Sequence, residues 1–316
     1  MAVSEAGVQA ANRRCPICNS DAQSLMYRPI LAPGPVVRCR SCGCVYISEV
    51  RDRRAIIFDG QEPDVAGETA PANHDHLVSA DCWEYGQLPA RELERPALGR
   101  NAADALGHLE RFTRPPGKLL DFGCGWGFFL EVAKARGWQP YGLEPLPGHA
   151  AYARSTVGVT VIADTLRQDT FPEAAFDAIT AFQVFEHLPD PRGELVKLHR
   201  ILKPGGIIMI EVPRIDTWSV RLFGSRHRHF VPDHLNFFST GTLGQLLGQQ
   251  GFEVLETYFP RRRLSVRHLV SFWGKRYLPL TLETGLARMA RRLGIWDRVV
   301  SVNLGDIVCV IARKRS

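Results

Sequence analysis

From residue 118 onward, the apolar positions of the chain follow two alternating periods. Short apolar runs at 118–122 (KLLDF), 139–144 (QPYGLE) and 176–182 (FDAITAF) predict buried strands. Between them, 128–136 and 192–202 place apolar residues three and four positions apart, which predicts amphipathic helices. Strands that alternate with helices of about ten residues are typical of a parallel, doubly wound α/β sheet.

The same pattern extends over most of the chain. Four more strands are expected at 159–163, 207–212, 252–259 and 306–313, and further helices at 90–112, 148–156 and 240–251. A segment at 260–300 interrupts the alternation before the last strand and predicts a helical insertion. We therefore expect one α/β domain of seven strands over residues 91–316, with this insertion near its end.

The first fifty residues show cysteine pairs instead of an apolar period. Cys15 and Cys18 form one C-x2-C pair, and Cys39 and Cys42 form a second pair after an interval of twenty residues. This spacing is typical of a zinc ribbon, in which four thiolates surround one Zn2+ at about 2.3 Å. Because a domain of this size buries little surface, the metal stabilises its fold. We expect a structural zinc ribbon over residues 1–50.

Residues 51–90 are polar, rich in Gly, Pro and Asp, and without a period, which predicts a linker. Cys44 is expected to be a buried strand residue, and Cys82, Cys124 and Cys309 to be free thiols. The start of the chain has no signal pattern, and the longest apolar stretches are far shorter than a membrane span. We therefore expect a soluble cytoplasmic protein, in which disulfides between the paired cysteines are disfavoured.

Composition and charge narrow the range of partners. The 316 residues are 45% hydrophobic and 23% charged, as in globular proteins. The net charge of +6 is uneven, because residues 261–298 hold ten Lys or Arg against only Glu283 and Asp297. A protein that binds nucleic acid spreads or stripes basic residues across its fold, so this concentration disfavours nucleic acid as the partner. We call residues 261–298 the basic segment.

The basic segment mixes arginines with Leu, Phe, Trp and Tyr, and several interpretations stay open. One interpretation is a helical lid over a substrate. A second is a contact with substrate phosphates, such as those of a nucleotide-linked sugar or lipid-linked glycan, and a third is a peripheral contact with an anionic membrane face. The alternative is a solvated helical face over a core stripe. The oligomeric state cannot be read from the sequence.

The candidate chemistry begins where the first strand ends. Gly123, Gly125 and Gly127 follow it with G-x-G-x-G spacing, and glycine permits a ligand to approach the backbone closely. This is neither the dinucleotide fingerprint nor a P-loop, so the turn suits a ligand without a pyrophosphate. Glu144 ends the second strand, where a carboxylate can accept hydrogen bonds from both hydroxyls of a ribose.

Five motifs occur in an order that resembles the class I S-adenosylmethionine (SAM)-dependent methyltransferases, over roughly residues 85–316. They are LLDFGCGWG, the acidic end of the second strand, VIADT, FDAITAFQVFEHLPDP and LKPGGIIMIEVP. The resemblance implies a Rossmann-like sheet with strand order 3-2-1-4-5-7-6, in which the seventh strand is antiparallel. It also implies that SAM is the cofactor.

The resemblance further assigns roles by position. Asp121 and Gly123 would line the methionine end of the cofactor, and Gly125 and Gly127 would form the turn below it. Glu144 would hold the ribose. The last two roles fall on residues after the third and fourth strands: Asp164 would accept from the adenine amino group, and Gln183 would lie near the methionine moiety.

The chain is also similar to methyltransferases of bacterial sugar and surface-polysaccharide pathways. Some deoxysugar C-methyltransferases of that kind also begin with a zinc ribbon, but they usually carry a further C-terminal domain for which this chain is too short. We therefore expect O-methylation of a hydroxyl on a sugar, a glycan or another small molecule. The alternative is a zinc-ribbon methyltransferase of ribosomal RNA, although the stretch from Cys15 to Cys44 holds few basic residues, namely Arg28, Arg38 and Arg40. A zinc-dependent interaction protein is a third, weaker option because the cofactor turn is intact.

A hydroxyl acceptor must lose a proton, and histidine titrates in the right range. His234, after the fifth strand, is the first candidate for the base, and His187, after the fourth, is the second. The structural alternatives are that His187 ties its loop to the next helix and that His234 packs its loop. His227 and His229 are expected to be exposed. The sequence shows no metal-ligand cluster at this edge.

Overall fold

The computed structural model of the protein describes residues 11–50, 88–277 and 279–315. Most of the predicted linker, residues 51–87, lies outside the described residues, and so does Cys82. Within the described part, no helix is long and apolar enough to cross a membrane.

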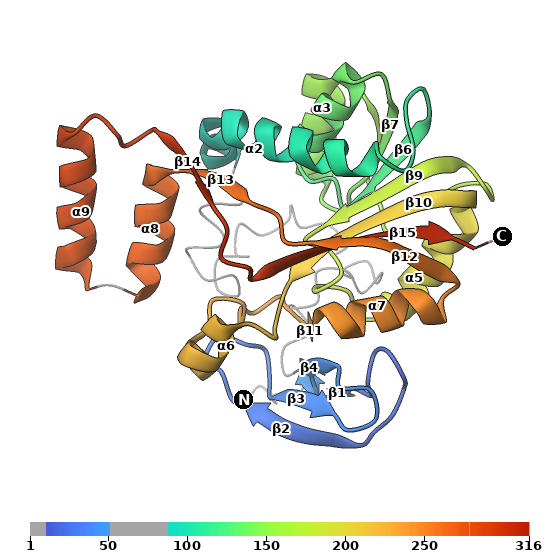
Figure 1. Cartoon of the computed structure of the whole chain (residues 1–316), viewed down its shortest axis with the longest axis horizontal. Helices are drawn as coiled ribbons and strands as arrows, with labels where there is room; N and C mark the ends of the chain where they lie inside the picture. Colours follow the sequence, from blue (N-terminus) through green and yellow to red (C-terminus); the bar gives the residue numbers. More distant parts are fainter. Residues whose placement is uncertain (1–10, 51–87, 278, 316) are drawn as a thin grey trace, which may run out of the picture.

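A seven-stranded mixed sheet forms the centre of the large domain (Figure 1). From edge to edge its strands are β12 (Phe252–Tyr258), β15 (Ile307–Lys314), β10 (Leu202–Pro213), β9 (Phe176–Phe182), β6 (Lys118–Phe122), β7 (Gln139–Leu143) and β8 (Thr160–Ile162). β15 is antiparallel to both of its neighbours, whereas the remaining pairs are parallel. The predicted order 3-2-1-4-5-7-6 and the α/β fold class are confirmed.

Helices cover both faces of this sheet (Figure 1). One face is covered by α2 (Leu88–Leu109), α3 (Phe128–Ala135) and α4 (Pro147–Tyr152), and the other by α5 (Pro191–Ile201) and α7 (Thr240–Gln249). Successive strand residues alternate between the faces. Leu119 packs in the cluster that contains Leu130 of α3, while Leu120 packs in the cluster that contains Leu198 of α5.

The helices begin at residues that satisfy their first backbone N–H groups. The Asp190 carboxylate accepts a hydrogen bond from the Gly193 N–H at 2.9 Å at the start of α5. At the start of α7, Ser239 and Thr242 form a reciprocal capping box. These local signals explain why the predicted helices at 192–202 and 240–251 lie within two residues of the observed ones.

The N-terminal ribbon and the large domain share a β-sheet. β2 (Gln23–Tyr27), β3 (Val36–Cys39) and β4 (Val45–Ile47) form an antiparallel sheet, and β11 (Asn236–Phe237) of the large domain pairs with β4 as a fourth strand. A two-residue pair of β1 (Ala11–Asn12) with β5 (Glu49–Val50) closes the ribbon. In Figure 1 the ribbon lies beneath α7 and β11.

Arg13 connects the ribbon to the large domain through hydrogen bonds. Its guanidinium donates hydrogen bonds to the carbonyl oxygens of Ile47, Leu235 and Pro189 and to Asn236 Oδ1, all at 3.0–3.1 Å. One side chain therefore connects the ribbon to the loop before β11 and to the segment before α5. No local pattern in the sequence marks this role.

The insertion differs from the predicted all-helical segment. β13 (Arg262–Ser265) and β14 (Val299–Val302) form an antiparallel ladder that carries α8 (Val266–Tyr277) and α9 (Leu280–Arg292). The two helices project to the left of the sheet in Figure 1. Part of the basic charge anchors this unit, because Arg262 pairs with Glu211 of β10 and Arg263 pairs with Asp104 of α2.

Candidate cofactor and acceptor site

The glycine turn after β6 has the backbone conformation that the sequence indicated. Gly123, Gly125 and Gly127 have φ values of 77°, 52° and 81°, in the left-handed region that favours glycine. A Cβ at Gly123 would lie 2.5 Å from a methyl carbon of Val184, and a Cβ at Gly127 would lie 2.8 Å from Ala153 Cβ. A Cβ at Gly125 would meet nothing within 4 Å, so the turn is open where a ligand would approach.

Glu144, directly after β7, faces this turn. Its carboxylate is 5% exposed and accepts hydrogen bonds from the Gly125 N–H at 2.8 Å and the Leu146 N–H at 3.0 Å. Burial raises the pKa of Glu144, and these two backbone hydrogen bonds oppose that shift. Each oxygen still has a lone pair available, so the oriented carboxylate suits a ribose diol. His149 of α4 lies 3.8 Å from Glu144 Oε1 and was missed in the sequence.

Asp121 is the buried acid of the same site. Its Oδ1 accepts a hydrogen bond from Thr180 Oγ1 at 2.7 Å. Burial raises the pKa of Asp121 to about 7, and the nearby Glu144 adds to the shift against the effect of Thr180. A cation at the methionine end of a ligand would favour the ionised form of Asp121. The assignment of Asp121 to that end stays a prediction.

A small pocket beside the turn suits an adenine ring. It is lined by Gly123, Pro145, Asp164, Leu166, Val184 and Leu188. Its walls are mostly apolar, and the half-exposed Asp164 carboxylate accepts from the Thr165 N–H and pairs with Arg167 at 3.2 Å. An apolar slot with one acceptor matches the chemistry of an adenine amino group, although Asp164 stays a predicted contact.

Gln183 lies at the end of β9, with a φ of 56°, which is uncommon for a residue other than glycine. Its backbone N–H donates to the Glu211 carbonyl oxygen at 2.9 Å, and its Nε2 donates to Glu211 Oε1 at 3.1 Å. Glu211 thus holds Gln183 and Arg262 together at this edge. The predicted place of Gln183 near the methionine moiety is not tested by these contacts.

The two candidate histidines lie together. The ring centroids of His187 and His234 are 4.8 Å apart, and His187 Nδ1 lies 3.0 Å from the Asp233 carbonyl oxygen. Burial lowers the pKa of His187, but the Asp233 and Glu186 carboxylates raise it above its ordinary value. Burial and the neighbouring His187 lower the pKa of His234 to about 3. His234 is therefore neutral near pH 7, and its role as the base stays a prediction.

The turn that carries His187 is pinned to the loop that carries His234. The Leu235 and Asn236 N–H groups donate to the Glu186 carbonyl oxygen at 2.7 and 3.0 Å. The Asn236 side chain, 1% exposed, donates to the carbonyl oxygens of Phe185 and Leu188. Asn236 therefore fixes the distance between the two histidines. Sequence reasoning missed it because its partners lie about fifty residues away.

The expectation that His227 and His229 are exposed was wrong. They are 1% and 5% exposed. His227 Nε2 lies 3.1 Å from Ser219 Oγ, and His229 Nε2 lies 3.1 Å from the Asp306 carbonyl oxygen. Their loop folds inward around the fully buried Phe230, so both imidazoles serve packing.

The expectation of no metal-ligand cluster at this edge also needs correction. The ligand atoms of Glu186, His187 and His234 all lie within 4.8 Å of one another. The sequence signal was the Glu-His dipeptide after the fourth strand, but the third member lies far along the chain. Local spacing could not reveal a cluster that two separate loops bring together.

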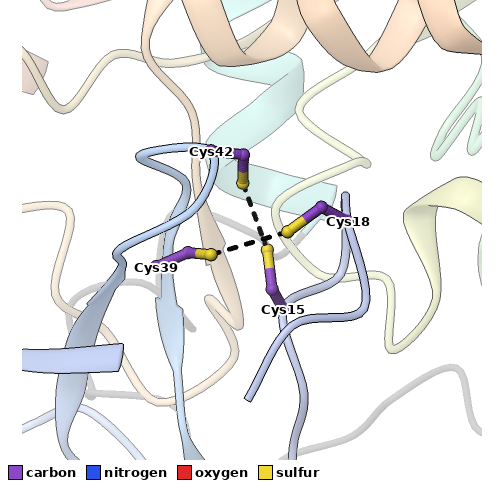
Figure 2. Close-up of side chains that lie close together, drawn as sticks. All are labelled: Cys15, Cys18, Cys39 and Cys42. Carbon is purple, nitrogen blue, oxygen red and sulfur yellow. Dashed lines mark hydrogen bonds between the residues drawn. The ribbon is translucent and has the colours of Figure 1, made fainter. Parts of the chain in front are cut away.

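The four paired cysteines of the ribbon converge on one point, as Figure 2 shows. The Sγ atoms of Cys15 and Cys42 are 3.4 Å apart, and those of Cys18 and Cys39 are 3.5 Å apart. A tetrahedron with Zn–S bonds of about 2.3 Å has edges of about 3.8 Å, so the donor set and its size fit a zinc ion. Cys44 is fully buried, as expected, but it lies directly before β4 and not within a strand.

Comparison with known proteins agrees with this geometry. A family model described as a methyltransferase domain matches residues 92–257. A Mycolicibacterium smegmatis protein named as an S-adenosylmethionine-dependent methyltransferase is 29% identical over 140 residues, which cover 44% of this chain and 53% of that protein. A ubiquinone biosynthesis O-methyltransferase of Pseudomonas aeruginosa is 33% identical over 99 residues, which cover 29% and 43%. The chain thus spans about half the length of these relatives.

A solved structure has the same fold. A chain of the complex between the Haloferax volcanii Trm112 methyltransferase activator and a methyltransferase has a TM-score of 0.51. It is 17% identical and covers 76% of this chain and 99% of its own length. Because the family match spans more than half of the chain, the protein belongs to the methyltransferase domain family, in the class I SAM-dependent methyltransferases.

Proposed function

We propose that the protein transfers a methyl group from SAM to a hydroxyl oxygen of a sugar or glycan. The observation that carries the proposal is the contact between the cofactor turn and the histidine turn. Val184 limits the space at Gly123, and the Val184 carbonyl oxygen accepts from the His187 N–H at 2.9 Å. His187 therefore follows, by one turn of three residues, the valine that borders the glycine turn.

The chemistry needs positioning and the removal of one proton. Bound SAM supplies a methyl group that is already activated for in-line displacement, so orientation accounts for most of the acceleration. Glu144 and the glycine turn would hold the ribose. The acceptor hydroxyl would lose its proton at the His187–His234 pair, its oxygen would bond to the methyl carbon, and the carbon–sulfur bond would break.

The names of the relatives support oxygen as the acceptor atom. Several of the curated relatives are ubiquinone biosynthesis O-methyltransferases, including one from Escherichia coli that is 28% identical over 179 residues. Their acceptor is not transferred to this chain, because the match covers only part of most of them. The names of these relatives nevertheless support methylation of oxygen over methylation of nitrogen or carbon.

The surface of α9 supports a lipid-linked acceptor at a membrane. Leu282, Leu286, Met289 and Leu293 are 56%, 38%, 53% and 64% exposed, and their spacing places them on one side of the helix. Exposed Arg288, Arg291 and Arg292 lie beside this stripe. An exposed apolar stripe flanked by arginines is typical of helices that rest on anionic bilayers.

A second exposed apolar group lies on α6 (Trp218–Phe223), where Trp218 is 64% exposed and Leu222 is 67% exposed. Both α6 and α9 lie toward the left of the molecule in Figure 1. We therefore propose that this side rests on an anionic membrane and receives a lipid-linked glycan there.

Binding to vesicles tests the membrane contact. The protein should sediment with vesicles that contain phosphatidylglycerol and not with pure phosphatidylcholine vesicles. Leu286→Glu should abolish sedimentation, whereas Leu25→Glu, at a leucine of the ribbon that is 54% exposed, should not. Equal sedimentation of the Leu286→Glu variant would remove the support for a membrane acceptor.

Transfer from labelled SAM tests the function itself. Lipid-linked glycans, nucleotide-linked sugars and ribosomal RNA fragments should be offered in parallel, with methyl ethers identified by mass spectrometry. Methylation of a glycan or sugar hydroxyl is expected. Methylation of RNA alone would replace the proposal with an RNA-modifying function, in which the ribbon contacts nucleic acid.

A further inference from the structure

Glu186 is a buried carboxylate that the protein leaves unsatisfied. Its side chain is 1% exposed, and neither Oε1 nor Oε2 has a hydrogen-bond partner among the described residues. Burying an ionised carboxylate without a partner is strongly unfavourable, so such a group takes up a proton or a cation. The surroundings of Glu186 decide between these two.

Two imidazoles face this carboxylate. His187 Nε2 lies 4.0 Å from Glu186 Oε1, beyond hydrogen-bond distance. His234 Nδ1 is also buried and without a hydrogen-bond partner in the described part of the chain. The ligand atoms of all three side chains lie within 4.8 Å of one another. Two bonds of about 2.1 Å to one ion span about 4.2 Å, so small movements would let the three share a cation.

The imidazole of His187 already has the orientation that is common for a metal-bound histidine. The 3.0 Å separation of His187 Nδ1 from the Asp233 carbonyl oxygen assigns the proton to Nδ1. The lone pair of Nε2 is then directed toward the cluster. Ligating histidines commonly donate their other N–H to a carbonyl or carboxylate in this way. Asn236 holds the two loops in place through the carbonyl oxygens of Phe185 and Leu188.

We propose that Glu186, His187 and His234 bind a divalent first-row cation, such as Mn2+ or Zn2+, beside the cofactor site. Two nitrogen donors and one carboxylate suit such ions better than Ca2+ or Mg2+, which prefer oxygen ligands. Three protein ligands leave positions open for water or an acceptor hydroxyl. The ion's role rests on the function proposed above: it would bind the acceptor oxygen and lower the pKa of that hydroxyl. With the ion bound, the two histidines would act as ligands, and the proton would leave to water in place of the direct transfer to the histidines.

The test uses Mn2+, which is paramagnetic and does not favour the four-thiolate ribbon. Full-length, untagged, zinc-loaded protein is titrated with MnCl2 without SAM or acceptor, and free Mn2+ is measured by electron paramagnetic resonance. We expect one bound Mn2+ per chain. Glu186→Gln, which keeps the shape of the side chain, and His234→Ala should each weaken binding at least tenfold.

His108→Ala is the matched control. His108 also pairs with a carboxylate, Glu256, at 3.1 Å, but it lies on α2 away from the cluster. Its Mn2+ affinity should equal that of the wild type. Absence of bound Mn2+, or equal binding in Glu186→Gln, overturns the cation site and leaves Glu186 as a carboxyl that takes up a proton.

SAM binding and methyl transfer measured on the same samples separate the two proposals. Methyl transfer that proceeds at the same rate with and without Mn2+ would overturn the role of the ion while the methyltransferase function stands. Mn2+ binding that requires Glu186, together with transfer stimulated by Mn2+ only when Glu186 is present, supports both.

Discussion

Arg13→Ala is expected to loosen the ribbon from the large domain while leaving the cofactor site intact. The variant removes four hydrogen bonds that join β4, the segment before α5 and the loop before β11. Those segments carry the scaffold of the histidine pair, but none of them belongs to the glycine turn or to Glu144. Turnover should therefore fall and SAM affinity should stay unchanged.

The free-energy loss expected for Arg13→Ala can be estimated from the four hydrogen bonds that the guanidinium donates. A hydrogen bond from a charged donor contributes about 1.5–3 kcal/mol, and bonds that share one donor are not additive. Burial lowers the pKa of Arg13 to about 10, which shows that desolvation offsets part of this gain. We expect a net loss of about 2–3 kcal/mol, equivalent to a roughly 30- to 150-fold increase in local opening.

Hydrogen–deuterium exchange of β4 and β11 is the direct assay, because backbone exchange there reports the opening of the joint. Arg14→Ala is the matched control. Arg14 is the next residue, and its side chain, 60% exposed, pairs with Asp21 at 3.4 Å, a contact worth less than about 1 kcal/mol. Equal exchange in the two variants, or a loss of SAM affinity in Arg13→Ala, would refute the reasoning.

Three further changes test other parts of the structure. Cys39→Ser should remove the zinc from a protein that otherwise contains about one Zn per chain, and an unchanged zinc content would contradict the ribbon assignment. His234→Ala should lower the turnover number by about 10²-fold with SAM affinity intact, whereas loss of SAM binding would show a structural role. Because the pKa of Asp121 is raised to about 7, the unfolded state releases its proton first, and stability should fall as the pH rises from about 4 to about 7. Asp121→Asn should reduce that slope in urea unfolding, and an unchanged slope would argue against the buried acid.

The central sheet could be predicted because its signals are local. The apolar runs at 118–122 and 176–182 coincide with β6 and β9, since strands buried on both faces read as continuous apolar segments. The cysteine pairs were equally local, and the structure brings all four sulfur atoms together. The left-handed backbone of the turn after β6 could also be predicted, because glycine is the residue that most readily adopts positive φ values.

Features that depend on distant pairing were missed. In the ladder of β13 and β14, Arg262 lies opposite Val302, forty residues later. Because two helices separate these short strands in the sequence, the whole segment was predicted to be helical. The partners of Arg13 lie up to 223 positions along the chain, so no local pattern marks its role. His227 and His229 appeared exposed because the segment is polar, yet both rings are buried together with the next residue, Phe230.

The most direct test of the account is a calorimetric titration of the protein with SAM. We predict that one SAM binds per chain. We also predict that Glu144→Ala weakens binding by tens- to several-hundred-fold, or about 2–4 kcal/mol, because two hydrogen bonds to a buried charged acceptor are lost. Glu253→Ala, at an exposed glutamate of β12, should bind as tightly as the wild type. Absence of SAM binding by the wild type, or wild-type affinity in Glu144→Ala, would contradict the account.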